Sequence, residues 1–171
     1  MNRILLCVFF VLTAISAQSQ NWGRLYSDLS SLHEKAKISI QAELDIEKNT
    51  LEIQQQILYH NFSNDTLKYI YLNDWANAFS AKNTPLAERF AENYRRRFHF
   101  AKDWERGYTQ VDYISHKGEK LSWMRPENHP DIIHLELEKP LLPFESRTFD
   151  LSYRIKIPSA DFTRWGYETT S

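Results

Sequence analysis

Hydrophobic and polar residues alternate along much of this chain with the two-residue period of a β-strand that buries one face. The clearest run has its apolar positions at Phe149, Leu151, Tyr153, Ile155 and Ile157. An earlier run has them at Ile38, Ile40, Ala42, Leu44 and Ile46. Both runs predict strands whose apolar face lies against a core.

The early run predicts one half of a hairpin. Residues 47–50 form a polar turn sequence, and a second apolar run returns through Leu51, Ile53, Ile57 and Tyr59. This order is typical of two antiparallel strands joined by a short connection. The polar triplet 54–56 interrupts the alternation and favours a β-bulge.

More strand signals follow at residues 67–72, 108–114, 121–123 and 133–137, with turns between them at 117–119 and 140–146. The second and third of these signals predict another hairpin. Six or seven strands, most of them apolar on one face, predict a mainly β fold, either an antiparallel β-sandwich or a saddle-like curved sheet.

The middle of the chain predicts one short helix, over about residues 84–97. Thr84 suits the N-cap position and Pro85 the first helical position. Leu86, Phe90, Ala91 and Tyr94 give the apolar stripe. We interpret the arginines at 95–97 as cations at the negative end of the helix dipole, in preference to a phosphate-binding patch.

The N-terminus has the pattern of a signal peptide. An apolar run covers residues 4–15, which suits a signal-peptide core and is too short to span a bilayer, and small residues follow at Ser16 and Ala17. We therefore expect a signal peptide at 1–17, a lead-in at 18–36 and one β domain at 37–171. The protein is expected to be exported, to a periplasmic, outer-surface or secreted location.

Composition limits how the exported chain can be stabilised. The one cysteine, Cys7, lies in the expected signal peptide, so we expect neither disulfides nor a thiolate metal site. Removal of Arg3 leaves 20 Lys and Arg against 22 Asp and Glu, a net charge of about −2. This balance disfavours nucleic acid as a partner. No stretch after the expected signal peptide is long enough to span a bilayer, so we expect no membrane association after cleavage.

Motifs of known catalytic chemistry are incomplete in this sequence. His33-Glu34 begins a His-Glu-x-x-His zinc signature, but position 37 is lysine. His129, Asp131 and His134 could gather around a metal, although surface placement is favoured. The chain has four glycines and no P-loop, nucleophile elbow or dinucleotide fingerprint. We therefore predict no catalytic residue, metal ligand or cofactor site in this chain.

Aromatic residues are the remaining candidates for binding. Trp75 and Trp104 flank the irregular middle segment and are candidates for an exposed platform that stacks on sugars or peptides. Asn61 and Asn64 each begin an N-glycosylation acceptor sequence, although in a bacterial protein they would be turn residues.

Several motifs occur in a familiar order. They include Tyr-x-Asn-x-Ser-x-Asp-x-Leu at 59–67, preceded by 42–45 and 49–51 and followed by Ile-Tyr-Leu at 70–72. Later segments are 75–79, 98–103, 106–108, 129–131, 140–143 and Arg-Trp-Gly-Tyr at 164–167. From residue 37 onward the chain resembles the N-terminal domain of the M1 family of zinc metallopeptidases, the aminopeptidase N-like enzymes, in its exported Bacteroidota-type members. It lacks the glycine that the family often has near 52–54.

The resemblance implies a non-catalytic role. In that family a saddle-like β domain packs on a catalytic domain, which supplies the zinc, its ligands and the Gly-x-Met-x-Asn loop. The sequence has none of these elements, so the resemblance implies a fragment that ends before the catalytic domain, its partner in cis if the reading frame continues. It would be inert alone and would help to wall a peptide cleft. The alternative is a free-standing exported module that binds peptide or glycan through exposed tryptophans.

Overall fold

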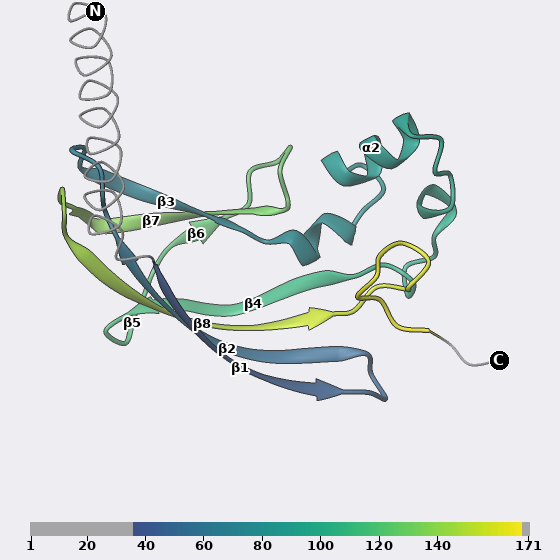
Figure 1. The fold of residues 1–171 in the computed structure, drawn as a ribbon, viewed down its shortest axis with the longest axis horizontal. Coiled ribbons are helices and arrows are strands. Elements are labelled where there is room, and N and C mark those ends of the chain that lie inside the picture. The colour runs from purple at the N-terminus through teal and green to yellow at the C-terminus, as the bar shows by residue number, and fades with distance from the viewer. Residues whose placement is uncertain (1–35, 169–171) are drawn as a thin grey trace, which may run out of the picture. The chain divides into compact units, whose positions relative to one another are not determined.

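The structure, a computed structural model, describes residues 36–168. The expected signal peptide, His33-Glu34 and nearly all of the lead-in lie outside these residues. The described chain folds into two antiparallel sheets with one short α-helix (Figure 1), which confirms the predicted mainly β class.

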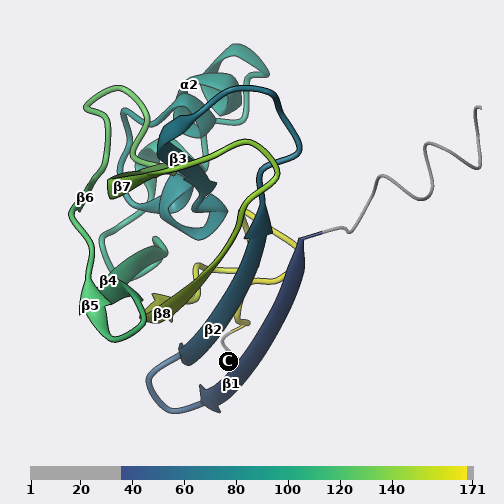
Figure 2. The same ribbon diagram turned by 90° about the vertical axis from the view of Figure 1, so that its left-hand side faces the viewer.

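The larger sheet has five strands in the order β1-β2-β8-β4-β5. Their bounds are β1 Lys37–Asp45, β2 Thr50–His60, β8 Ser146–Lys156, β4 Tyr108–His116 and β5 Glu119–Lys120. The smaller sheet has the order β3-β7-β6, with β3 Leu67–Asn73, β7 Ile132–Leu141 and β6 Trp123–Met124. Figure 2 shows the curvature of the β1–β2 hairpin.

The main core lies between the two sheets because alternate residues of both sheets face each other. Its buried side chains come from β2, β3, β4, β7 and β8, and they are Ile57, Ile70, Ile114, Ile133, Leu135, Leu137, Leu141, Phe149 and Leu151. The alternation seen in the sequence therefore identifies the inward residues of most strands correctly.

The predicted β1–β2 hairpin is confirmed, but the predicted bulge is wrong. The register runs without a shift from Lys37↔Leu58 to Asp45↔Thr50. The pairing of β2 with β8 is equally regular. Gln55 occupies an inward position and accepts a 2.7 Å hydrogen bond from the Tyr153 hydroxyl. A satisfied polar side chain thus replaces an apolar one without any extra residue in the strand.

The turn of the second predicted hairpin is confirmed, but its return strand is not the predicted segment 121–123. β5 pairs with β4 through Ser115↔Lys120 and His116↔Glu119. Trp123 belongs to β6 and pairs with Leu135 of the other sheet. The chain therefore crosses between the sheets just after β5.

Three helical segments pack beside the sheets around a second core. They are η1 Trp75–Phe79, α2 Pro85–Glu92 and η2 Phe98–Phe100. The buried residues of this second core are Phe79, Ala87, Phe98 and Ala101. The predicted N-cap is confirmed, because the Thr84 hydroxyl accepts from the Ala87 amide at 3.2 Å.

The predicted end of the helix is wrong, since α2 ends at Glu92 and not near residue 97. Tyr94 has φ 58°, and two hydrogen bonds close the helix, from Tyr94 N to Ala91 O at 3.0 Å and from Arg95 N to Phe90 O at 2.8 Å. This is a Schellman ending, in which glycine usually holds the left-handed position. The arginines at 95–97 therefore lie beyond the helix.

Candidate functional site: an apolar groove

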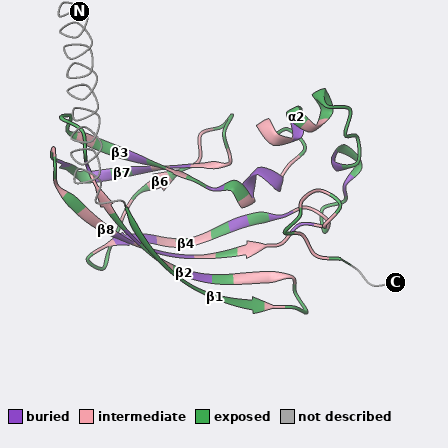
Figure 3. Ribbon diagram, viewed as in Figure 1, coloured by how far each residue is buried: buried purple, intermediate pink, exposed green. Residues whose placement is uncertain are grey.

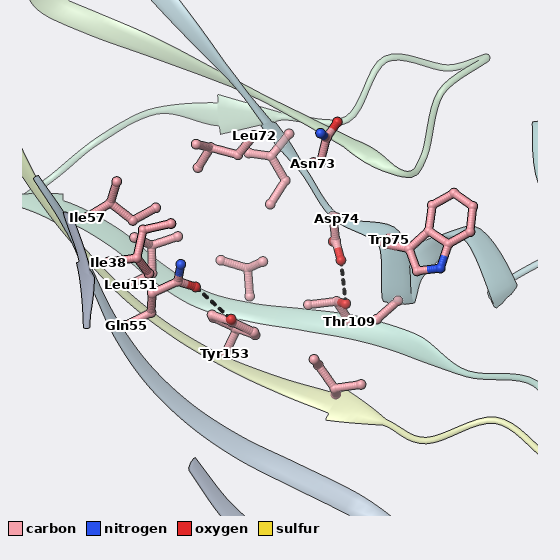
Figure 4. Close-up of a pocket in the computed structure, with 14 residues that line it drawn as sticks. Ile38, Gln55, Ile57, Leu72, Asn73, Asp74, Trp75, Thr109, Leu151 and Tyr153 are labelled. Carbon is pink, nitrogen blue, oxygen red and sulfur yellow. Dashed lines mark hydrogen bonds between the residues drawn. The ribbon is translucent and has the colours of Figure 1, made fainter. Parts of the chain in front are cut away.

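An open apolar groove of about 390 Å³ lies along the inward face of the larger sheet. Side chains from β1, β2, β3, β4, β7 and β8 line it, together with the start of η1 (Figure 4). Ile38, Ile57, Leu72, Val111 and Leu151 make most of it hydrocarbon. Such concave apolar surfaces with a few polar groups are typical of binding sites.

The groove opens beside β1, which contributes Ile38 to its lining and has an uncovered apolar face. Ile38, Ile40 and Leu44 share a face with the inward residues of β2, but they are 54%, 57% and 54% exposed. Figure 3 shows β1 as an exposed strand beside a partly buried β2. The prediction that this strand buries its apolar face is therefore wrong within the described residues. The three-stranded sheet does not shield this edge of the five-stranded one.

A buried ion pair lies at one end of the groove. Asp74 Oδ1 accepts from the Thr109 hydroxyl at 2.6 Å, and Asp74 Oδ2 accepts from Arg125 Nη2 at 2.5 Å. The side chain of Asp74 is 7% exposed and that of Arg125 is 21% exposed. Arg125 also lies over the Trp123 ring, 5.2 Å from its centroid. Both oxygens of this carboxylate are thus engaged by protein donors.

Asn77 extends this polar cluster. Its amide nitrogen donates to Pro130 O at 2.6 Å, and its amide oxygen accepts from Thr109 N at 3.1 Å. Arg125 Nε donates to the same Pro130 carbonyl at 3.1 Å. The cluster joins η1, β4 and the loop before β7, so it supports the groove structurally and leaves no free general base in Asp74.

Tyr153 is the other polar group in the groove. Burial raises the pKa of its phenol, and the negative charge of Asp74 raises that pKa further. The hydroxyl therefore stays protonated at neutral pH and donates to Gln55 (Figure 4).

The two predicted platform tryptophans have different surroundings. Trp75 lines the groove, is 58% exposed and meets Phe79 edge-on. Trp104 is 60% exposed but lies in the loop before β4 and does not line the groove. Both are exposed as expected, and their binding role remains a prediction.

The candidate metal residues do not converge. His129 Nδ1 is 3.9 Å from Asp131 Oδ1, and His134 is stacked on Tyr71 with Tyr69 edge-on. Over residues 36–168 no three His, Cys, Asp or Glu side chains form a group that could hold a metal ion.

Asn61 is unsuited to glycosylation. It is 1% exposed, and its amide nitrogen donates to the carbonyls of Asp65, Leu141 and Leu142. Asn64 in the same turn is exposed. The polar turn sequence therefore fixes the connection between β2 and β3 and holds it against the loop after β7.

Sequence reasoning missed Asp74, Thr109, Arg125 and Tyr153 as a group. They come from segments up to 79 residues apart, and no local spacing connects them. The one available signal was an isolated aspartate that directly follows an apolar strand.

No helix in the described part of the chain is long and apolar enough to cross a membrane. No protein-family model and no curated protein matches this sequence.

Proposed function

We propose that this chain is the non-catalytic N-terminal domain of an M1-type zinc metallopeptidase and that it packs on the catalytic domain through the groove face. The observation that carries the proposal is the uncovered apolar face of β1. Exposed contiguous apolar surface of this kind marks interaction sites. The zinc and the catalytic residues would belong to the partner domain, and this domain would help to wall the peptide cleft.

The residues that carry the family resemblance have structural roles, which suits a packing domain. Asn61 organises the turn after β2. Trp165 meets Phe79, a residue of the second core, edge-on. A Cβ on Gly166 would lie 2.3 Å from Ala160 N, so only glycine fits at that position.

Domain association tests the proposal directly. The purified chain is mixed with an M1-type catalytic domain from the same genome, produced without its own N-terminal domain, and complex formation is followed by size-exclusion chromatography. We expect a complex that the triple change Ile38→Ser, Ile40→Ser and Leu44→Ser abolishes. The matched control is Tyr69→Ser with Tyr71→Ser, on exposed positions of β3.

Two further results bear on the proposal. A genomic reading frame that continues past codon 171 into His-Glu-x-x-His would support it. Zinc-dependent hydrolysis of aminoacyl anilides by the purified chain alone would contradict the expected inertness. Absence of any complex with the catalytic domain would contradict the packing role.

The exposed indole of Trp75 in the groove supports a second candidate function, a free-standing module that binds peptide or glycan. Stacking of a ligand on this indole would change its fluorescence. The second function is favoured if Trp75→Ala abolishes ligand binding. The control is Trp123→Phe, a change at the tryptophan that contacts Arg125, which should leave binding intact.

A further inference from the structure

The connection between α2 and β4 carries a concentrated positive charge. Between residues 93 and 102 there are three arginines and one lysine and no acidic residue. We call residues 93–104 the basic aromatic loop, since Tyr94, Phe98, Phe100 and Trp104 are interleaved with these cations. Figure 1 shows this part of the chain at the same end of the domain as α2.

Tyr94 occupies a backbone position that does not favour tyrosine. Its φ of 58° is left-handed, and this conformation is less favourable for a residue with a Cβ than for glycine. Its side chain is 86% exposed, and it makes no ring contact with any residue of the described chain. Folding therefore gains little from this ring, which points to a role outside the domain.

One aromatic side chain of the loop is buried in the second core, while other aromatics of the loop are exposed. Phe98 is 2% exposed and meets Phe79, Phe90 and Phe162 edge-on. Phe100, only two residues away, is 74% exposed. A buried anchor next to exposed rings presents those rings in a fixed position.

The cations of the loop are only partly neutralised. Arg97 pairs with Asp161 at 2.5 Å, whereas Arg95 and Arg96 have no ion pair with any residue described by the structure. Lys102 Nζ lies 4.7 Å from the centroid of the Trp104 ring.

Carboxylates in and beside the loop offset part of this charge. Asp103 accepts from Arg106 at 2.6 Å, and Glu105 accepts from the backbone amide of Lys102 at 2.6 Å, a bond that leaves the charge of Glu105 in place. Glu92, on the last turn of α2, is also acidic. Among the described residues, Arg95, Arg96 and Lys102 therefore give three positive charges without an ion pair, against the two negative charges of Glu92 and Glu105.

We propose that the basic aromatic loop docks on the surface of an anionic phospholipid bilayer. Tyrosine and tryptophan rings favour the headgroup region, and each lysine or arginine near a negatively charged membrane adds attraction. The expectation of no membrane association rested on the absence of a spanning segment, which does not bear on surface contact. This inference does not depend on the M1 assignment.

Vesicle co-sedimentation tests the proposal with the exported form, purified after removal of the signal peptide. We expect binding to mixed phosphatidylglycerol and phosphatidylcholine vesicles that falls with added salt, and little binding to phosphatidylcholine alone. Arg95→Ala with Arg96→Ala should weaken binding about 30-fold. Lys68→Ala with Lys120→Ala, an equal charge change at exposed positions elsewhere, should leave binding unchanged.

The variant Tyr94→Gly distinguishes a loss of membrane docking from a loss of folding stability. Glycine suits the left-handed position, so the melting temperature should stay the same or rise while vesicle binding falls several-fold. Equal binding to both vesicle types, no binding to the anionic ones, or no effect of the double arginine variant would overturn the proposal. So would tighter binding to double-stranded DNA than to the vesicles. The triple serine variant at Ile38, Ile40 and Leu44 should bind vesicles normally, so this test and the domain-association test can fail independently.

Discussion

Asp74 is the central residue of the polar cluster at one end of the groove. Its carboxylate is almost fully buried and is bonded to Thr109 and Arg125. Removal of one partner of a buried pair leaves the other charge without compensation, and this costs far more than the loss of an exposed pair.

Asp74→Asn should therefore lower the free energy of unfolding by about 3 kcal/mol, because Arg125 loses its counter-charge. Urea denaturation followed by tryptophan fluorescence measures the change. The control is Glu52→Gln, which breaks the exposed pair with Arg154 and should cost less than about 1 kcal/mol. Equal effects of the two changes would show that the Asp74 pair is not effectively buried.

The raised pKa of Tyr153 predicts that the protein loses stability at high pH. Its pKa in the folded state is raised above the ordinary value of 10.0 by burial and by the charge of Asp74. The unfolded chain therefore loses its phenolic proton first, and stability falls as the pH rises from about 10 through the folded pKa.

Tyr153→Phe should lower stability at neutral pH, since Gln55 loses its hydrogen bond, and should flatten the fall above pH 10. Thermal melts across the alkaline range provide the measurement. An unchanged alkaline slope would assign the fall to other tyrosines.

Among the elements, α2 shows how local signals define one end of a helix and not the other. Thr84 and Pro85 mark the start through capping and a preset φ. The helix ends where Tyr94 adopts a left-handed conformation, and the sequence has no glycine there to mark that end. A sequence with a continuing apolar stripe therefore predicts a longer helix than the chain forms.

Thr84→Ala should destabilise the protein by about 1 to 2 kcal/mol, because Ala87 N loses its acceptor and the Ala78 carbonyl loses a 2.7 Å donor. Thr84→Ser keeps both bonds and serves as the matched control. Thermal melting of the two variants gives the comparison, and similar losses in both would mean that the methyl group matters more than the cap.

At the scale of the whole molecule, the main property is an apolar face that the domain does not cover by itself. Ile38, Ile40 and Leu44 are more than half exposed, whereas Ile114 on β4 and Leu135 on β7 are fully buried. The domain folds around the core between its sheets, so the β1 face contributes little to its stability.

The triple change to serine at Ile38, Ile40 and Leu44 should therefore reduce the fluorescence of a bound hydrophobic dye while changing the free energy of unfolding by less than about 1 kcal/mol. Leu135→Ala, in the core, should cost about 3 kcal/mol. A large loss of stability in the triple variant would show that the β1 face is buried in solution.

The sequence by itself determined the elements whose signals are local. Alternation placed β1, β2, β7 and β8, and the Thr84-Pro85 pair placed the start of α2, because periodicity and capping depend on neighbours in the chain. It also identified Trp75 and Trp104 as exposed aromatics.

Only the tertiary structure decided which apolar faces are covered. β1 and β8 have the same alternation, but β8 lies inside the larger sheet and β1 at its edge, beyond the reach of the smaller sheet. Asp74, Thr109 and Arg125 likewise meet only because three distant segments converge. Burial and the pairing of buried charges depend on residues that are close in space but distant in the sequence. A short segment of the sequence does not contain this information.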